Sequence, residues 1–401
     1  MSEKIVVTSV GLISALGHGV AANIEAMRNG NSGLRHPLHL KTVHASEFVM
    51  GEVRMGNEEM ATQLGLPADH SYSRTALLAL MAVKELLAGA DMDLLRNESL
   101  ALINAGTVGG MCTVEDLYPE FMSPGTGDYI KYIDTLDCSE STENIATHFG
   151  LKPFMATIST ACSSSSNAAL LGARMIKQGL VKRAICGGCD ALSRFTLNGF
   201  NSLKNVAKEP CMPFDQNRVG LNLGEGAAYL MLETESSARA RGAKILAVFS
   251  GYCNSNDAYH PTAPSPHGDG AYNTMWQAMN MAGLKPEDIG YVNAHGTATI
   301  NNDIAEGIAI SRLFSGHIPY FSSTKPFTGH TLAAAGAMGA IYSIAAMAQG
   351  IALPNLNFKT PMEELQIVPT TKLVEQLSIK HVLSNSFGFG GNNVSLAFSA
   401  S

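Results

Sequence analysis

Residues 153–173 read PFMATISTACSSSSNAALLGA and contain no Asp, Glu, Lys or Arg. The pattern predicts a strand over residues 155–158, a turn rich in Ser and Thr, and a helix over residues 166–178. A helix that opens with small uncharged side chains on every face is typical of one buried inside a large protein. Cys162 lies in the turn between these two elements.

A second uncharged stretch has the same design. From Pro326 to Phe358 the chain has 33 residues without Asp, Glu, Lys or Arg. A strand is predicted at residues 320–323, then a turn that holds Lys325 and His330, then another small-residue helix. Ala and Gly, rather than Leu, fill the centre, so we expect a buried helix and no membrane span.

The two stretches suggest that one βα unit occurs twice in the chain. Strands over residues 5–10 and 245–250 would open the two copies, which divides the chain into residues 1–250 and 251–401. Chance similarity between two Ala/Gly-rich helices is the alternative explanation. Elsewhere predicted strands alternate with helices, which favours α/β layers with mostly parallel sheets. The other strands are expected at 100–105, 183–186, 227–232, 291–294 and 394–398, and the other helices at 75–88, 234–241 and 271–282.

Composition narrows the class of protein. With 46% hydrophobic residues in 401, the chain is too apolar to be disordered. A net charge of −7 gives no overall basic surface for nucleic acid. Seven scattered cysteines do not form a disulfide framework, so we expect reduced thiols and a cytoplasmic protein. The CGGC sequence at residues 186–189 has no second pair for zinc and is interpreted as a turn after a strand.

Cys162 is the first candidate for chemistry. A cysteine between a strand and a helix N-terminus lies near free backbone N–H groups, which should lower its thiol pKa and favour a nucleophile. The alternative is a buried structural cysteine, the usual fate of this residue.

Two histidines and a lysine occupy similar positions. His295 follows a predicted strand, and His330 lies at a predicted helix start, where a neutral imidazole is favoured. Lys325 stands in apolar company and needs an anionic partner, for which Asp303 and Glu306 are the nearest candidates in sequence. A Gly-rich turn at residues 384–393 (SNSFGFGGNN) could offer N–H groups to an oxyanion or act as a gate.

Four motifs in this order closely resemble the elongating 3-oxoacyl-(acyl-carrier-protein) synthases, condensing enzymes of the thiolase fold. They are TACSS at 160–164, NAHGTAT at 293–299, STK with GH at 323–330, and NSFGFGG at 385–391. The resemblance implies two duplicated βα halves in a layered α-β-α-β-α sandwich. It also implies decarboxylative condensation of malonyl-carrier protein with an acyl chain held on a cysteine, without a metal or redox cofactor.

The resemblance assigns roles to named residues. Cys162 would carry the acyl chain, His295 and His330 would stabilise the enolate, and the N–H groups of Cys162 and Phe389 would bind the oxyanion. Lys325 and Glu306 would form a supporting ion pair, with Asp303 nearby. The remaining assignments are Thr262, Thr297 and Thr299 at the phosphopantetheine arm, Val108 in the acyl pocket, and Lys204 and Lys208 at the dock for an acidic acyl-carrier protein.

Two departures affect the substrate. Asn392 stands where the family often has Thr, and RVGL at residues 218–221 replaces the usual RDGF. The alternative is therefore a specialised polyketide or polyene synthase with a dedicated carrier. We expect a homodimer, with a heterodimer with a chain-length partner as the other possibility. A papain-like cysteine hydrolase would leave the second histidine, the lysine and the Gly-rich loop without roles. A nonenzymatic scaffold is disfavoured because all the reactive residues are present.

Overall fold

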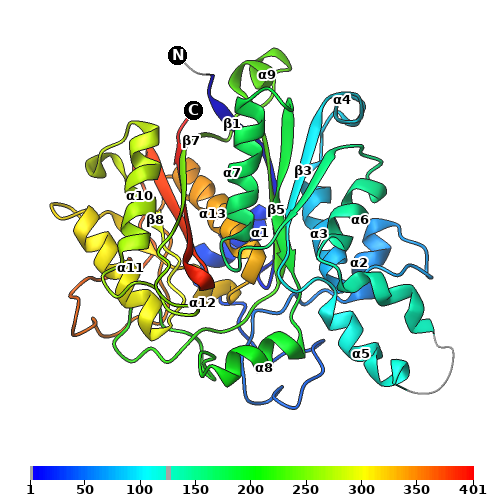
Figure 1. The fold of residues 1–401 in the computed structure, drawn as a ribbon. Coiled ribbons are helices and arrows are strands. Elements are labelled where there is room, and N and C mark those ends of the chain that lie inside the picture. Colours follow the sequence, from blue (N-terminus) through cyan, green and yellow to red (C-terminus); the bar gives the residue numbers. More distant parts are fainter. Residues whose placement is uncertain (1–2, 123–127) are drawn as a thin grey trace.

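The computed structural model describes residues 3–122 and 128–401 (Figure 1). Its strands are β1 (Ile5–Ser14), β2 (Gly17–His18), β3 (Leu100–Ala105), β4 (Phe154–Ile158), β5 (Arg183–Asp190), β6 (Gly226–Thr234), β7 (Ala247–Asn256), β8 (Tyr291–Asn293), β9 (Tyr320–Ser322), β10 (His381–Phe387) and β11 (Asn392–Ser399). Its helices are α1 (Val20–Arg28), α2 (Asn57–Leu64), α3 (Arg74–Leu86), α4 (Met92–Asn97), α5 (Met111–Phe121), α6 (Glu140–His148), α7 (Ser164–Lys177), α8 (Arg194–Ser202), α9 (Glu235–Ala240), α10 (Asp269–Ala282), α11 (Ile300–Leu313), α12 (Lys325–Thr328) and α13 (Ala335–Gln349).

Strand order confirms the predicted duplication. From the centre outward, one half of the sheet runs β1-β6-β5-β3-β4 and the other runs β7-β11-β10-β8-β9. Strand directions repeat as well, since the three outer strands of each half are parallel and the two inner pairings are antiparallel. The halves join where β1 meets β7, through the pairs Val6–Val248 and Val7–Ala247. The predicted boundary at residue 250 falls inside β7.

Five layers follow from how the helices cover the strands (Figure 1). Helices α7 and α13 lie in the middle: α7 contacts β3 and β5 of one half and β11 of the other, while α13 contacts β8 and β10 and also β6. On the outside, α3 packs on β1 and β6, and α10 packs on β7 and β11. This arrangement is the expected α-β-α-β-α sandwich.

The two central helices approach each other very closely. A Cβ atom on Gly336 would lie 2.2 Å from Ser166 Oγ, and the Ala337 N–H donates to Ser165 Oγ at 2.9 Å. Only a glycine fits between backbones at this distance. Because Cys162 precedes α7 and His330 precedes α13, this contact brings their two turns together.

Two sequence interpretations can be compared with the fold. The CGGC stretch is not a turn, because β5 continues through it to Asp190. Its Gly187 lies against Tyr229 and Gly188 against Ala105, positions with no space for a Cβ. Within the described chain, one helical stretch is long and apolar enough to cross a membrane, Leu332–Gln349. That stretch is 78% buried inside the protein, as expected for a core helix.

A buried ion pair fixes the start of α3. The Arg74 guanidinium contacts both carboxylate oxygens of Glu225, at 2.6–3.0 Å, and also donates to Asn57 and to the Val53 carbonyl. Both side chains are almost entirely buried. Removing one partner of such a pair leaves an uncompensated charge in the interior, which is far more costly than losing an exposed pair.

We therefore expect Arg74→Ala to lower the free energy of unfolding by about 3–5 kcal/mol. Arg239→Ala is the matched control, because it removes an exposed pair with Glu235 on α9 that contributes about 0.3–0.5 kcal/mol. Urea denaturation followed by circular dichroism measures both. Equal denaturation midpoints for the two variants would show that the buried pair contributes no more to stability than the exposed pair.

Candidate functional site

Cys162 stands in a strained turn between β4 and α7. Ala161, just before it, has φ at 52°, a left-handed conformation that non-glycine residues rarely adopt. Hydroxyl groups stabilise this turn, since Ser164 Oγ donates to the Ala161 carbonyl at 2.6 Å and accepts from the Thr160 N–H at 2.8 Å. The backbone thus presents the sulfur at the N-terminal end of α7.

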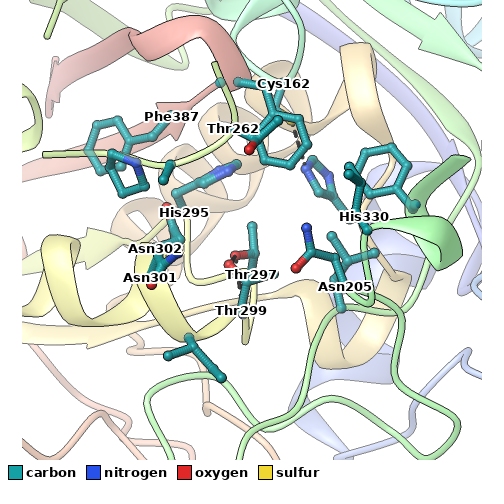
Figure 2. A pocket seen from close by; sticks show the side chains of 18 of the residues that line it. Cys162, Asn205, Thr262, His295, Thr297, Thr299, Asn301, Asn302, His330 and Phe387 are labelled. Carbon is teal, nitrogen blue, oxygen red and sulfur yellow. Dashed lines mark hydrogen bonds between the residues drawn. The ribbon is translucent and has the colours of Figure 1, made fainter. Parts of the chain in front are cut away.

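His330 contacts the cysteine directly. Its Nε2 lies 3.0 Å from Cys162 Sγ, and its Nδ1 accepts the Leu332 N–H at 3.3 Å. A backbone N–H can only donate, so these partners assign the proton of the neutral ring to Nε2. Figure 2 shows the rings of His295 and His330 both turned toward Cys162.

His295 is held in the same tautomer by Lys325. The Lys325 Nζ donates to the His295 carbonyl oxygen and lies 3.4 Å from His295 Nδ1. An ammonium group has donors only, so Nδ1 accepts and Nε2 carries the proton. The two ring centroids are 5.4 Å apart and nearly perpendicular. Two N–H donors therefore face one region beside the sulfur.

The expected ion pair between Lys325 and Glu306 is not a direct contact. In the described part of the chain the Lys325 Nζ contacts His295 and forms no salt bridge within 4 Å. Burial lowers the Lys325 pKa, although the Glu306 charge still acts to raise it. Glu306 instead accepts the N–H groups of His295 and Gly296, at 2.8 and 2.7 Å, and Asp303 accepts those of Phe214 and Ala298. Both carboxylates thus accept backbone N–H groups, because the loop that carries His295 packs against the start of α11.

Burial dominates the ionisation of the site. The expected lowering of the Cys162 pKa is wrong: burial raises the pKa of this thiol to about 11, although the Lys325 charge acts in the opposite direction. Burial also lowers the pKa of His295 and of His330 well below the usual histidine value, and the Lys325 charge adds to this effect. Both imidazoles are therefore neutral at physiological pH, as predicted for His330.

The Gly-rich loop closes over the sulfur. The N–H groups of Phe389 and of Cys162 itself face Sγ, and the Phe389 ring stacks on Phe200 of α8 at 5.7 Å. Behind the loop, Asn392 Oδ1 accepts three hydrogen bonds at 2.9–3.0 Å. Their donors are Ser163, Asn167 and Asn254. The residue that departs from the family pattern thus ties the loop to α7 and β7.

A cavity of about 390 Å³ opens in front of these groups (Figure 2). Of the residues singled out from sequence, it is lined by Cys162, His295, His330, Phe389, Thr262, Thr297, Thr299 and Lys204. Thr297 and Thr299 share a hydrogen bond of 2.8 Å. Val108 does not line this cavity, and Lys208 lies outside it in an ion pair with Glu47 at 3.0 Å.

Sequence reasoning missed Asp190, at the end of β5. This carboxylate is fully buried and accepts hydrogen bonds from Thr107, Val108 and Ala333. An acidic residue at the end of a buried strand is a signal for a functional residue in an α/β protein. The backbone N–H of Leu332 fixes the His330 tautomer. Every residue except proline has such a group, so the sequence does not indicate this role.

Comparison with known proteins agrees with this geometry. Two family models match the chain, the beta-ketoacyl synthase N-terminal domain over residues 2–238 and the C-terminal domain over residues 246–359. The 3-oxoacyl-[acyl-carrier-protein] synthase 2 of Staphylococcus aureus is 32% identical over 99% of this chain and 98% of its own, and that of Synechocystis is 33% identical over the same shares.

Solved structures show the same likeness. The ishigamide ketosynthase/chain length factor has a TM-score of 0.91 at 30% identity, and both chains are covered in full. A ketosynthase from Xenorhabdus doucetiae, in complex with its chain length factor, has a TM-score of 0.82 at 31% identity, with 100% of this chain and 98% of that one covered. By its motifs, its duplicated fold and these relatives, the chain belongs to the beta-ketoacyl synthase family.

Proposed function

We propose that this protein condenses an acyl chain bound to Cys162 with malonyl-acyl-carrier protein, losing carbon dioxide and forming 3-oxoacyl-acyl-carrier protein. The observation that carries the proposal is the pair of neutral imidazoles with both Nε2–H groups directed beside one thiol. A hydrolase that needs one base for one cysteine would have no use for the second donor.

The first half-reaction loads the cysteine. The Cys162 sulfur attacks the thioester carbonyl of the acyl-carrier protein, and the carrier's phosphopantetheine thiol leaves with the thiol proton. The N–H groups of Phe389 and Cys162 lie at the sulfur and stabilise the tetrahedral oxyanion. The Nε2–H of His330, 3.0 Å away, stabilises developing thiolate charge on the sulfur.

The second half-reaction makes the carbon–carbon bond. As the malonyl carboxylate leaves as carbon dioxide, negative charge develops on the thioester oxygen, and the Nε2–H groups of His295 and His330 stabilise it. The resulting carbanion attacks the acyl-Cys162 carbonyl. Collapse of that oxyanion breaks the bond to sulfur and releases the Cys162 thiolate, which takes a proton from solvent to return the thiol. Thr262, Thr297 and Thr299 line the cavity and would hold the phosphopantetheine arm.

An acidic carrier protein would bind at the mouth of the cavity. Lys204 lies there with an exposed side chain, and its φ of 56° ends α8 in a tight turn. The chain itself carries a net charge of −7, so a local positive charge is needed to attract a partner of the same sign. Lys208 would contribute less, since Glu47 already neutralises it.

The exposed edge strand β4 supports a dimer with a second copy of this chain. Among the described strands β4 pairs only with β3, and its Phe154 and Met155 are 55% and 46% exposed. The unpaired backbone groups of such an edge form a template for pairing with a strand of another chain. Free cysteines throughout the described residues support a cytoplasmic location.

A second candidate function is a polyketide or polyene synthase with a chain-length partner. It is favoured by the likeness, at 30–31% identity, to ketosynthases whose structures include a chain length factor. In that case a different subunit would cover β4.

The roles of the two histidines predict separable defects. His295→Ala and His330→Ala should each lower the release of carbon dioxide from malonyl-carrier protein by about 10²–10³-fold, while acylation of Cys162 is partly retained. His317→Ala, at an exposed site, is the control. An imidazole is neutral above its pKa, and burial lowers both values. The wild-type decarboxylation rate should therefore not fall near pH 6.5. A wild-type decarboxylation rate in either variant would remove that histidine from the mechanism.

Reversal of the charge at the cavity mouth should weaken carrier recognition. We expect Lys204→Glu to raise the apparent KM for carrier-bound substrate by about tenfold and to reduce its salt dependence. The rate with a small pantetheine thioester should be unchanged. Lys380→Glu is the control, because Lys380 directly precedes β10, at the end of the strand opposite the Gly-rich loop. Equal losses with both substrates would contradict a docking role.

Light scattering tests whether the chain dimerises through the edge strand β4. The purified chain alone should have the mass of two chains, and Phe154→Glu should convert it to a monomer. Trp276→Glu is the control, because Trp276 is 46% exposed, close to Phe154 at 55%, but lies on α10. A wild-type chain that is monomeric alone would contradict the homodimer and favour a different subunit.

A further inference from the structure

We infer that Asp190 is a positioning residue for His330, which it holds through the backbone of residues 332 and 333. This inference rests on the proposed function, because it concerns how one of the two enolate donors is kept in its productive tautomer. The argument begins at the imidazole and works back to the carboxylate.

The His330 tautomer depends on one backbone N–H. The Leu332 N–H donates to Nδ1 at 3.3 Å, which favours the tautomer with the proton on Nε2 and orients the ring. The main chain of His330 is fixed separately, by its N–H to the Asn222 carbonyl at 2.7 Å and its carbonyl to the Gly224 N–H at 3.0 Å. The orientation of residue 332 therefore decides whether the ring is held.

Leu332 has a backbone conformation that is unfavourable for a leucine. Its φ is 49°, in the left-handed region that a side chain with a Cβ disfavours. A backbone in this state persists only where its surroundings impose it. The next peptide is the one that is restrained, because the Ala333 N–H donates to Asp190 Oδ2 at 2.8 Å.

Asp190 is itself firmly anchored. Its side chain is fully buried, and Oδ1 accepts the N–H groups of Thr107 and Val108 at 3.0 and 3.3 Å. Oδ2 accepts the Thr107 hydroxyl at 2.6 Å in addition to the Ala333 N–H. One carboxylate thus joins the turn after His330 to the loop after β3, which contains Val108.

Asp190→Asn breaks one of these bonds selectively. The amide oxygen should take the place of Oδ1, where two N–H groups need an acceptor. The amide nitrogen then replaces Oδ2, where it can still donate to the Thr107 hydroxyl but opposes the Ala333 N–H. Thr107→Val is the matched control, because it removes the hydroxyl from the same oxygen and leaves the Ala333 bond in place.

The test compares two partial reactions in the full-length protein. We expect Asp190→Asn to lower decarboxylation of malonyl-carrier protein by about 10–100-fold and to lower acylation of Cys162 much less, as expected for His330→Ala. Thr107→Val should leave both rates near wild type. A merely structural role would lower both reactions together, and that result, or an unaffected Asp190→Asn variant, would overturn the inference.

A double variant gives a second readout. Glycine adopts a φ of 49° without penalty, so Leu332→Gly combined with Asp190→Asn should recover part of the lost decarboxylation. A double variant no faster than Asp190→Asn alone would contradict the role of the strained backbone, and this comparison also applies if the single variant is poorly folded. Failure of wild-type protein to decarboxylate malonyl-carrier protein would instead refute the proposed function.

Discussion

The close contact between α7 and α13 is the constraint on which the site depends. Helix α7 follows β4 and α13 follows β9, the outermost strand of each half, and the chain before each helix carries a reactive residue. Gly336 and Ser166 allow the helices to meet with almost no space between their backbones. The thiol and the imidazole that precede them consequently lie 3.0 Å apart, although they are 168 residues apart in sequence. A larger residue at position 336 would separate the two turns.

Hydrogen-bond donors, more than charges, organise the chemistry. Both Nδ1 atoms receive a donor, one from Lys325 and one from the Leu332 backbone, so both Nε2–H groups face the cavity. Burial keeps the two rings neutral and disfavours the free thiolate. The carboxylates of Glu306 and Asp303 accept N–H groups of the His295 loop, from His295 and Ala298, and do not contact the lysine directly. The site is therefore prepared to receive negative charge on a substrate oxygen without first holding it on a side chain.

The sequence predicted the architecture and the reactive residues because both leave local signals. Apolar strands, small-residue helices and the residues at their junctions were visible, and the repeat of the 153–173 pattern at 320–358 correctly indicated duplication. β10 was missed because its Ser384, Asn385 and Ser386 resemble a loop, whereas Asn385 is buried against Glu306 and Ser395. The lysine–glutamate pair, the thiol pKa and the role of Asp190 depend on depth and on backbone direction. Those properties arise only when distant segments pack, so residue types alone do not encode them.

The tautomers of the two histidines also affect whether the site can bind zinc. The Cys162 sulfur and the nitrogens of His295 and His330 lie within 4.8 Å of one another, a donor set that zinc accepts. An imidazole that binds zinc through Nε2 must carry its proton on Nδ1 and needs an acceptor there. Here an ammonium and a peptide N–H occupy those positions, so zinc would have to displace two donors before it could bind. The contacts that direct both Nε2–H groups toward an enolate oxygen therefore also disfavour zinc binding at this site.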